Sequence, residues 1–225
     1  MVRFASVADR DAVENEMLYA ERKLPHSIYA ALTGMRDTHP QRPAISFQLF
    51  SAPDAPARTL SWNDLHERVT ETANLFSQLG IGRKDVVAYL LPNCLEAPIT
   101  LIAGATVGIV NPINPLLEPE QIAGILRETG AKVLVTLKSF PKADIAQKAA
   151  AAVAMAPNVQ TVLEVDLRRY LTGIKRLLVP LMRPKTPTRH HAKVMDFEAA
   201  ASARRHNRLT FDEVTEDRVA AYFHT

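Results

Sequence analysis

Apolar and polar positions alternate along the chain between short strand-like runs and stretches with helical spacing. The strand-like runs are Val86–Leu91, Ile109–Val110, Val133–Leu137, Val159–Leu163 and Val219–Phe223. Strands that alternate with helices of this length are joined by right-handed crossovers and pair mostly in parallel. The sequence therefore predicts an α/β fold: a mostly parallel sheet with helices on both faces.

The intervening helices carry their own start and stop signals. Ser61 is a good N-cap, and Asp64 three residues later suits the positive end of a helix that should stop at Gly80. Pro119 falls in the first turn of a second helix, which should end at Gly130. Further helices are predicted over Ala143–Met155 and, with small residues that allow close approach to a sheet, over the stretch before Ile109.

The first sixty residues form a lead-in to this pattern. Residues 28–35 have apolar positions at helical spacing, and Gly34 and Pro40 should weaken and end that helix. Ala44–Phe50 and Arg58–Leu60 are predicted as short strands on either side of a proline turn. We therefore expect a lead-in over 1–60 and an α/β unit over 61–225, with a basic insertion at about 166–208.

The basic insertion departs from the alternation. Between Arg168 and Arg208 it has eleven Lys or Arg residues and two acids, which gives a local net charge of +9. Since the net charge of the whole chain is +3, the rest of the chain has a net charge of 3 − 9 = −6. Apolar residues near one predicted helical face are Leu167, Tyr170, Leu171, Ile174 and Leu178. A solvated structural insertion is the preferred interpretation. Weak peripheral contact of residues 167–185 with anionic lipid is the alternative. We expect no nucleic-acid binding, because only Tyr170 is aromatic in the cluster.

Composition indicates an ordinary soluble globular protein. The 225 residues are 47% hydrophobic and 23% charged, enough to bury a core. The single cysteine, Cys94, excludes an internal disulfide, and its apolar surroundings indicate a packing residue in a reducing, cytoplasmic compartment. The charged residues of 1–16 are unlike a secretory signal. The uncharged window Ala97–Leu117 contains three prolines, so a buried helix running into a buried strand explains it better than a membrane span.

Several short motifs, taken in order, resemble the adenylate-forming (AMP-binding) superfamily of acyl-CoA synthetases. The motifs are Thr59-Leu60-Ser61-Trp62-Asn63-Asp64-Leu65, Ala73-Asn74-Leu75, Leu79-Gly80-Ile81, Asp85-Val86-Val87-Ala88, Leu91-Pro92-Asn93 with Glu96, Asn111-Pro112-Ile113-Asn114-Pro115, and Ile122–Thr129 with Gly130-Ala131-Lys132-Val133. The run from Val219 to Thr225 resembles the strand that leads into the family's Ser/Thr/Gly-rich phosphate loop.

The resemblance implies an ATP-dependent carboxylate–CoA ligase, here of the fatty-acid type, represented by its N-terminal part. Such an enzyme uses ATP, Mg²⁺ and coenzyme A to convert a carboxylic acid to an acyl-adenylate and then to a thioester. Thr225 would be the first residue of the phosphate loop, and His224 is a candidate for approaching nucleotide or acyl group. The resemblance places the catalytic and magnesium-binding residues after Thr225. We therefore expect no catalytic residue in this chain, no cofactor bound to it alone, and no activity from it alone.

The sequence gives little support for a metal site, and two other classes of function remain as alternatives. Adjacent His190 and His191 point in different directions and have no cysteine or carboxylate pair beside them, so no metal site is predicted. A non-catalytic α/β binding or scaffold module is the alternative from another class of function. An adenylation domain of the peptide-synthetase type is the alternative among enzymes.

Overall fold

The computed structural model describes residues 5–18, 21–52, 55–203, 207–213 and 216–224. Its helices are α1 (Val7–Glu14), α2 (Ile28–Thr38), α3 (Trp62–Gln78), α4 (Glu96–Val107), α5 (Pro119–Thr129), α6 (Ile145–Ala154), the 3-10 helix η2 (Leu167–Tyr170), α7 (Gly173–Met182) and α8 (Phe197–Ser202). Its strands are β1 (Pro43–Gln48), β2 (Ala57–Ser61), β3 (Val86–Leu90), β4 (Ile109–Pro112), β5 (Val133–Leu137), β6 (Thr161–Val165) and β7 (Lys193–Asp196).

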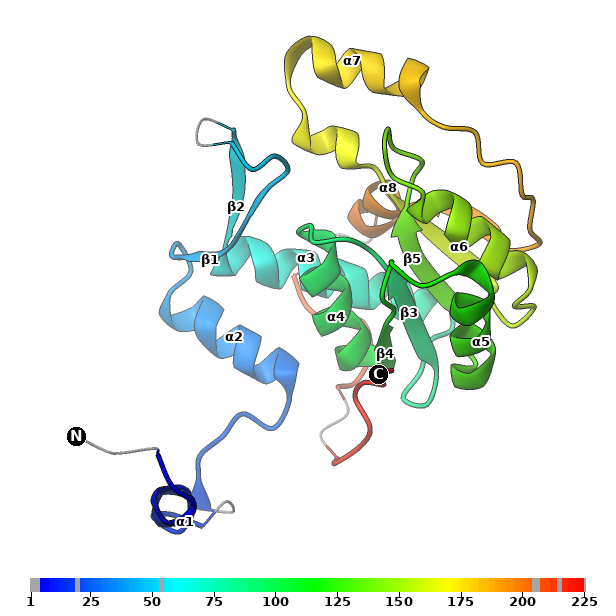
Figure 1. Ribbon diagram of the computed structural model, residues 1–225. Helices are drawn as coiled ribbons and strands as arrows, with labels where there is room; N and C mark the ends of the chain where they lie inside the picture. Colours follow the sequence, from blue (N-terminus) through cyan, green and yellow to red (C-terminus); the bar gives the residue numbers. More distant parts are fainter. Residues whose placement is uncertain (1–4, 19–20, 53–54, 204–206, 214–215, 225) are drawn as a thin grey trace.

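The central feature of the described chain is a five-stranded parallel sheet in the order β4-β3-β5-β6-β7. Helices α3, α4 and α8 pack together on one face, and α5 and α6 pack together on the other (Figure 1). Every residue of β5 is buried, as expected for a strand covered on both faces. The predicted α/β class, with a mostly parallel sheet between helical layers, is confirmed.

Local chemistry sets the ends of the main helices. Ser61 and Asp64 form a reciprocal capping box at the start of α3, and Gly80, with φ of +81°, lies just beyond its end. Pro119 occupies the first turn of α5, and Gly130 stops that helix in the left-handed conformation. The predicted helix starts and stops at these four positions are confirmed.

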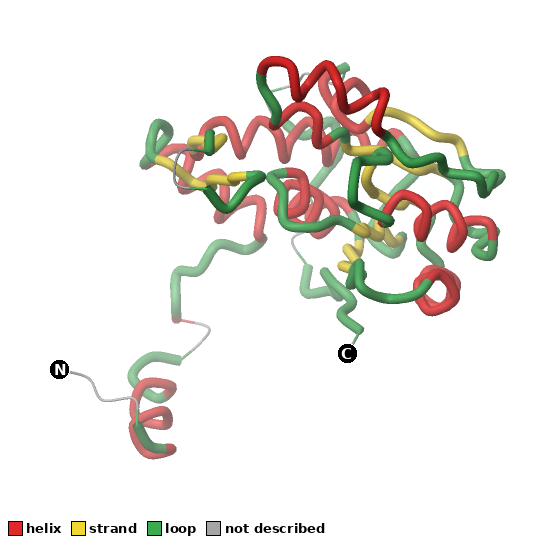
Figure 2. Tube along the Cα trace, turned by 45° about the horizontal axis from the view of Figure 1, so that its top comes forward, coloured by secondary structure: helices red, strands yellow, loops and turns green. Residues whose placement is uncertain are grey.

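The N-terminal elements flank the sheet. The two short strands predicted before and after the proline turn are β1 and β2, and they form an antiparallel pair. Helix α2 begins at Ile28 and ends at Thr38, two residues before Pro40. Both α2 and the β1–β2 hairpin contact α3. Helix α1 has no buried residue and lies apart from the α/β body in both views (Figures 1 and 2).

Two sequence predictions about strands need correction, and one strand of the sheet was not predicted. The fourth strand is Thr161–Val165 rather than Val159–Leu163, because Asn158 instead holds a turn by donating to the carbonyls of Leu126 and Ala131 at 2.8 Å each. The run Val219–Phe223 is not a full strand; it forms a single parallel bridge, between Ala221 and Val110. The fifth strand is β7, which the sequence pattern did not predict within the basic segment.

The basic segment does not form one continuous helix, contrary to the predicted helical face. It divides into η2 and α7, and Gly173 at the junction has a φ of +57°. Leu167, Tyr170 and Leu171 are buried, whereas Ile174 and Leu178 are exposed. The residues predicted to share one face therefore belong to two different environments.

The uncharged window Ala97–Leu117 folds into most of α4, then β4 and the turn after it, as the sequence predicts for a buried helix followed by a buried strand. Across the described ranges, no helix combines the length and apolarity needed to cross a bilayer.

Candidate functional site at the carboxyl edge of the sheet

The strand order creates a switch point at β3. The chain passes from β3 to β4 on one side and then returns to place β5 on the other side. In open parallel sheets, ligands bind outside the carboxyl ends of the strands at such a point. The segments that leave this edge begin at Leu91 after β3, at Ile113 after β4 and at Lys138 after β5. This edge is therefore the place where the groups predicted from the sequence should gather.

A segment from near the end of the chain, residues 218–224, runs along the free edge of β4. The amide of Val110 donates to the carbonyl of Ala220 at 3.0 Å, and the amide of Tyr222 donates to the carbonyl of Val110 at 2.9 Å. Because the bridge is parallel, this segment travels toward the same carboxyl edge as β4. The prediction of a full strand was wrong here, but the segment lies beside the sheet as expected.

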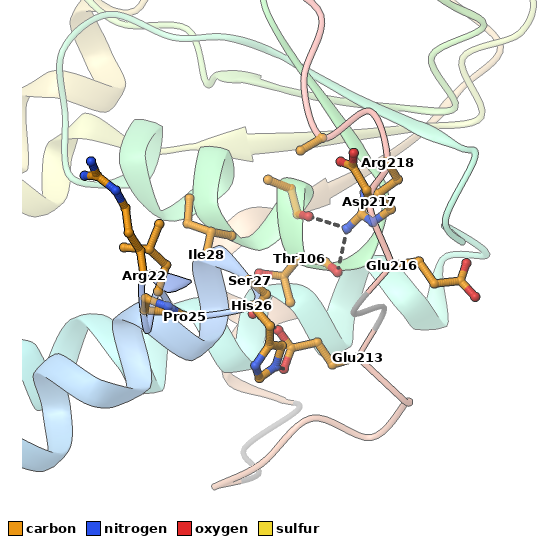
Figure 3. Close-up of a pocket in the computed structure, with 13 residues that line it drawn as sticks. Arg22, Pro25, His26, Ser27, Ile28, Thr106, Glu213, Glu216, Asp217 and Arg218 are labelled. Atoms are coloured by element: carbon orange, nitrogen blue, oxygen red, sulfur yellow. Dashed lines mark hydrogen bonds and ion pairs between the residues drawn. The ribbon is translucent and has the colours of Figure 1, made fainter. Parts of the chain in front are cut away.

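Arg218 fixes the beginning of this segment. Its guanidinium donates to the carbonyls of Gly108 at 2.6 Å, Ala105 at 2.5 Å and Thr106 at 3.2 Å, at the C-terminal end of α4. Figure 3 draws the bonds to Ala105 and Thr106. Carbonyls at a helix C-terminus lack intrahelical donors and carry partial negative charge, so a cation stabilises them. Burial lowers the pKa of Arg218, which starts high enough that the side chain stays cationic.

Asn111 fixes the other end of the segment. Its side chain is fully buried, and its Nδ2 donates to the carbonyl of Tyr222 at 3.0 Å and to Nδ1 of His224 at 3.2 Å. Since Nδ1 accepts this bond, the neutral His224 ring carries its proton on Nε2, which lies 3.9 Å from the Glu128 carboxylate. The Oδ1 atom of Asn111 is buried and has no hydrogen-bond partner in the described part of the chain. A polar acceptor is thus held at the carboxyl edge.

The predicted site residues have different outcomes. His224 lies at the carboxyl edge, in contact with Asn111, and its approach to a nucleotide or acyl group stays a prediction. Thr225, the predicted first residue of the phosphate loop, lies outside the described residues. The sequence pattern did not single out Asn111 or Arg218 as functional. Asn111 was visible as part of the Asn-Pro motif that ends a strand, whereas Arg218 had no local signal because its partners lie more than 100 residues earlier.

The residues present do not by themselves fit an ATP–magnesium group. Binding phosphates needs clustered backbone N–H groups, usually in a glycine-rich loop, together with cations. None of the eight glycines lies in the loops 91–95, 113–118 or 138–144 that follow β3, β4 and β5. Within the described ranges there is also no cluster of three His, Cys, Asp or Glu residues suited to a metal. His191 Nε2 lies 2.8 Å from the carbonyl of Val159.

A separate cavity of about 570 Å³ lies at the other end of β4. It is bounded by the last turn of α4, the start of α2, Glu213 and residues from 216–220, and Figure 3 shows Glu213, Glu216, Asp217 and His26 around it. The cavity therefore borders the anchor of the 218–224 segment, at Arg218, and is remote from the carboxyl edge where Asn111 and His224 lie.

Comparison with known proteins gives this arrangement its context. The family model described as AMP-binding enzyme matches residues 35–189, which is most of the chain. The chain belongs to the AMP-binding enzyme family. The resemblance stated from the sequence motifs is thereby confirmed, and the matched residues include every parallel strand except β7.

Several curated relatives are named as CoA ligases or CoA synthetases, and another is named naringenin synthase. The chain is 41% identical over 93 residues to marinolic acid–CoA ligase of Pseudoalteromonas sp. (strain SANK 73390), which covers 40% of this chain and 14% of that ligase. It is 38% identical over 81 residues to the acetyl-coenzyme A synthetase of Sodalis glossinidius (strain morsitans), and this match covers 36% of this chain and 12% of that synthetase. The matched segments are thus a small part of each relative's length.

Solved structures of the same class share the fold. An anthranilate CoA ligase in complex with anthranoyl-AMP superposes with a TM-score of 0.65 at 16% identity, over 90% of this chain and 32% of that one. Coronafacic acid ligase from Pectobacterium brasiliense superposes with a TM-score of 0.63 at 12% identity, over 88% of this chain and 33% of that ligase. The chain spans about a third of each structure, and at these identities the likeness supports the fold alone.

Proposed function

We propose that this chain is the N-terminal part of a longer AMP-forming acid–thiol ligase, which joins a carboxylic acid to coenzyme A through an acyl-adenylate. Within it, residues 61–225 act as the α/β unit that positions the nucleotide loop, and residues 1–60 as a lead-in. Membership of the AMP-binding family and relatives named as CoA ligases support this proposal. The complete protein would use ATP, Mg²⁺ and coenzyme A.

The observation that carries the proposal is the pinning of residues 218–224. Arg218 anchors the segment at the amino end of β4, and Asn111 anchors it at the carboxyl end. A loop that follows His224 would therefore start at a fixed place on the edge where parallel sheets bind ligands. Phosphoryl-group chemistry depends on such positioning, because misplacing groups by about 1 Å can lower the rate ~100-fold. Asn111 and Arg218 act here as positioning residues.

The proposal also includes the type of acid and the cellular compartment. The acid is of the fatty type, which the exposed apolar residues of α7 support as a place where a lipid-derived substrate could be encountered. The compartment is the reducing cytoplasm, which the free, buried thiol of Cys94 supports. The 225-residue chain alone is inactive, because its own loops lack the groups that bind phosphates.

The positioning role is tested by Asn111→Ala in the product of the complete reading frame. Losing the bonds to Tyr222 and His224 should lower the kcat for ATP–pyrophosphate exchange by about 10- to 100-fold, with circular dichroism unchanged. The matched control is Asn114→Ala, since Asn114 lies on the same stretch and, among the described residues, its side chain accepts a bond from the amide of Leu116 and from no other group. Equal exchange by both variants would contradict the positioning role.

A further inference from the structure

The excursion between β6 and β7 is pinned at both ends. Asp166 and Arg183 form an ion pair of 2.5 Å between Oδ2 and Nη2, which joins the start of the excursion to the end of α7. Beyond it, Ser139 Oγ donates to the carbonyl of Pro184 at 2.6 Å, and the side chain of Gln147 donates to the carbonyl of Lys185 at 3.2 Å. Helix α7 is therefore held in place by contacts on either side of it.

The inner side of the excursion is fastened to the body of the protein. Tyr170 is buried and donates to the Glu96 carboxylate at 2.7 Å, while Arg169 pairs with the same carboxylate at 2.9 Å. Within α7, Val179 is only 5% exposed and marks the inward face of the helix. With this face fixed, the opposite face of α7 has a defined orientation.

The outward face of α7 is an apolar stripe. Ile174, Leu177, Leu178 and Leu181 recur at the i, i+3, i+4 and i+7 positions that share one side of a helix. Leu177 is 74% exposed and Leu181 is 84% exposed, and Met182 continues the stripe. Large contiguous apolar patches on a soluble protein usually mark an interaction site. We call this stripe, from Ile174 to Met182, the α7 face.

The surroundings of the α7 face are cationic. From residue 167 to residue 195 the sequence has no acid, and the Lys and Arg residues there are Arg168, Arg169, Lys175, Arg176, Arg183, Lys185, Arg189 and Lys193. Within the described ranges, Arg176, Lys185 and Arg189 are exposed and form no ion pair with an acid. Lys175 Nζ lies 5.5 Å from the ring centroid of Phe50, an exposed residue next to the β1–β2 turn, and Figure 1 shows that hairpin at the same end of the molecule as α7.

We propose that the α7 face, with its rim of cations, is a docking surface for an anionic lipid bilayer. An amphipathic helix with apolar residues on one side and Lys or Arg beside them lies in the interfacial plane of a membrane, with its apolar side chains among the acyl chains. The ten residues of α7, interrupted by Pro180, are too few to span a bilayer and sufficient for this shallow contact. Charge complementarity selects the occupant, because a field of uncompensated cations favours anionic headgroups over a neutral surface.

The α7 face lies toward the carboxyl edge of the sheet, where the proposed function places the nucleotide loop. The excursion starts directly after the carboxyl end of β6, so α7 leaves the sheet from the same edge at which β4 delivers Asn111. Docking through α7 would bring that edge toward the lipid. The inference goes beyond the proposed ligase function and does not depend on it, since binding to vesicles can be measured in the absence of ATP or any acid.

The test is co-sedimentation of the 225-residue chain with vesicles of phosphatidylcholine alone or with about one third phosphatidylserine. We expect binding to the anionic vesicles only, weakened when salt rises from about 0.05 M to about 0.5 M as the Debye length shortens. The double variant Lys175→Glu and Arg176→Glu should reduce the binding constant by about tenfold or more. The variant Leu177→Ser should also weaken binding, by removing an inserted side chain.

Matched controls separate the α7 face from general charge and hydrophobicity. Lys23→Glu with Lys84→Glu makes the same change in net charge at exposed sites outside the segment 166–208, and Leu18→Ser removes an exposed leucine in the N-terminal segment, away from the carboxyl edge. Both controls should bind like the parent chain, and circular dichroism should show all variants folded. The proposal is overturned if the parent does not bind anionic vesicles, if both charge variants bind equally, or if α7 instead mediates a dimer that Leu177→Ser dissociates.

Discussion

Individual residues decide how closely the layers of this fold approach one another. Gly108 sits where α4 turns into β4, and a Cβ placed there would lie 2.6 Å from the carbonyl oxygen of Asp85 and 2.8 Å from that of Gly82. The small residues before Ile109 predict close approach to the sheet, and this is confirmed at Gly104, where an added Cβ would lie 3.0 Å from the Cβ of Val110 in β4. The atoms that Gly108 approaches could not be predicted, since they belong to a turn more than 20 residues earlier.

Replacing Gly108 should therefore be more damaging than replacing a glycine with space around it. We expect Gly108→Ala to lower the free energy of unfolding by about 2 kcal/mol or more, because backbone atoms must move. A Cβ added at Gly124, inside α5, would have no neighbour within 4 Å, so Gly124→Ala should raise the free energy of unfolding by about 0.5–1 kcal/mol. Urea denaturation measures both, and equal effects would contradict the packing at Gly108.

His66 makes stability depend on pH. Its ring is buried between α2 and α3, where Arg36 Nη1 lies 3.2 Å from Nε2. Burial, followed by the charge of Arg36, lowers the pKa of His66 from 6.5 to about 4. The folded state therefore resists protonation that the unfolded state accepts. Its stabilising contribution is present above pH 6.5 and is lost as pH falls toward 4.

We expect this group to remove up to about 3 kcal/mol of stability across that window. The variant His66→Gln should be less stable than the parent at pH 7, but the difference should shrink as the pH approaches 4. The measurement is urea denaturation of both proteins at several pH values. A parent and variant that lose stability in parallel would show that His66 is not the group responsible.

Secondary-structure elements divide into those set by local signals and those set by distant partners. The ends of α3 and α5 follow from caps and glycines within a few residues, so the sequence predicted them. Strand β7 is different: its burial is slight, and it exists because β6 offers an edge with which residues 193–196 pair. The split of the predicted basic helix is similar, since the burial of Tyr170 depends on Glu96, 74 residues away. Pairings of this kind are not visible in a local pattern.

Glu96 should be essential for fixing the basic segment. Glu96 is 1% exposed as a residue, and its carboxylate accepts from Tyr170 Oη and from Arg169. Burial and the neighbouring carboxylate raise the pKa of Tyr170, which keeps its hydroxyl protonated as a donor. Removing the carboxylate leaves the Tyr170 hydroxyl without its acceptor and leaves Arg169 with Glu198 as its ion-pair partner. Glu96→Ala should therefore lower the free energy of unfolding by about 1–3 kcal/mol.

The exposed pair of Arg10 and Glu14 provides the comparison for this prediction. Its atoms lie 3.7 Å apart on α1, and Glu14→Ala should change stability by less than about 0.5 kcal/mol. Thermal unfolding gives both values. If Glu96→Ala is no more destabilising than Glu14→Ala, the buried contacts do not hold the segment.

At the scale of the whole molecule, the chain is a parallel α/β unit, and different groups lie at the amino and carboxyl ends of its strand β4. The amino side of β4 carries the Arg218 anchor and an open cavity, whereas the carboxyl side carries Asn111 and His224. The sequence predicted the class of fold and the family from ordered motifs. It could not predict the anchors of the 218–224 segment, because Asn111 and Arg218 act across more than 100 residues of chain and only the folded topology joins them.

The central proposal is that the 225-residue chain is part of a longer ligase and is inactive alone. It is tested most directly by ATP–pyrophosphate exchange with fatty and aromatic acids. The 225-residue chain and the product of the complete reading frame would be measured side by side. We predict acid-dependent exchange by the complete product and none by the chain alone, because the chain's own loops lack a glycine-rich phosphate cradle. Clear exchange by the 225-residue chain, or no exchange by the complete product with any acid, would contradict the account.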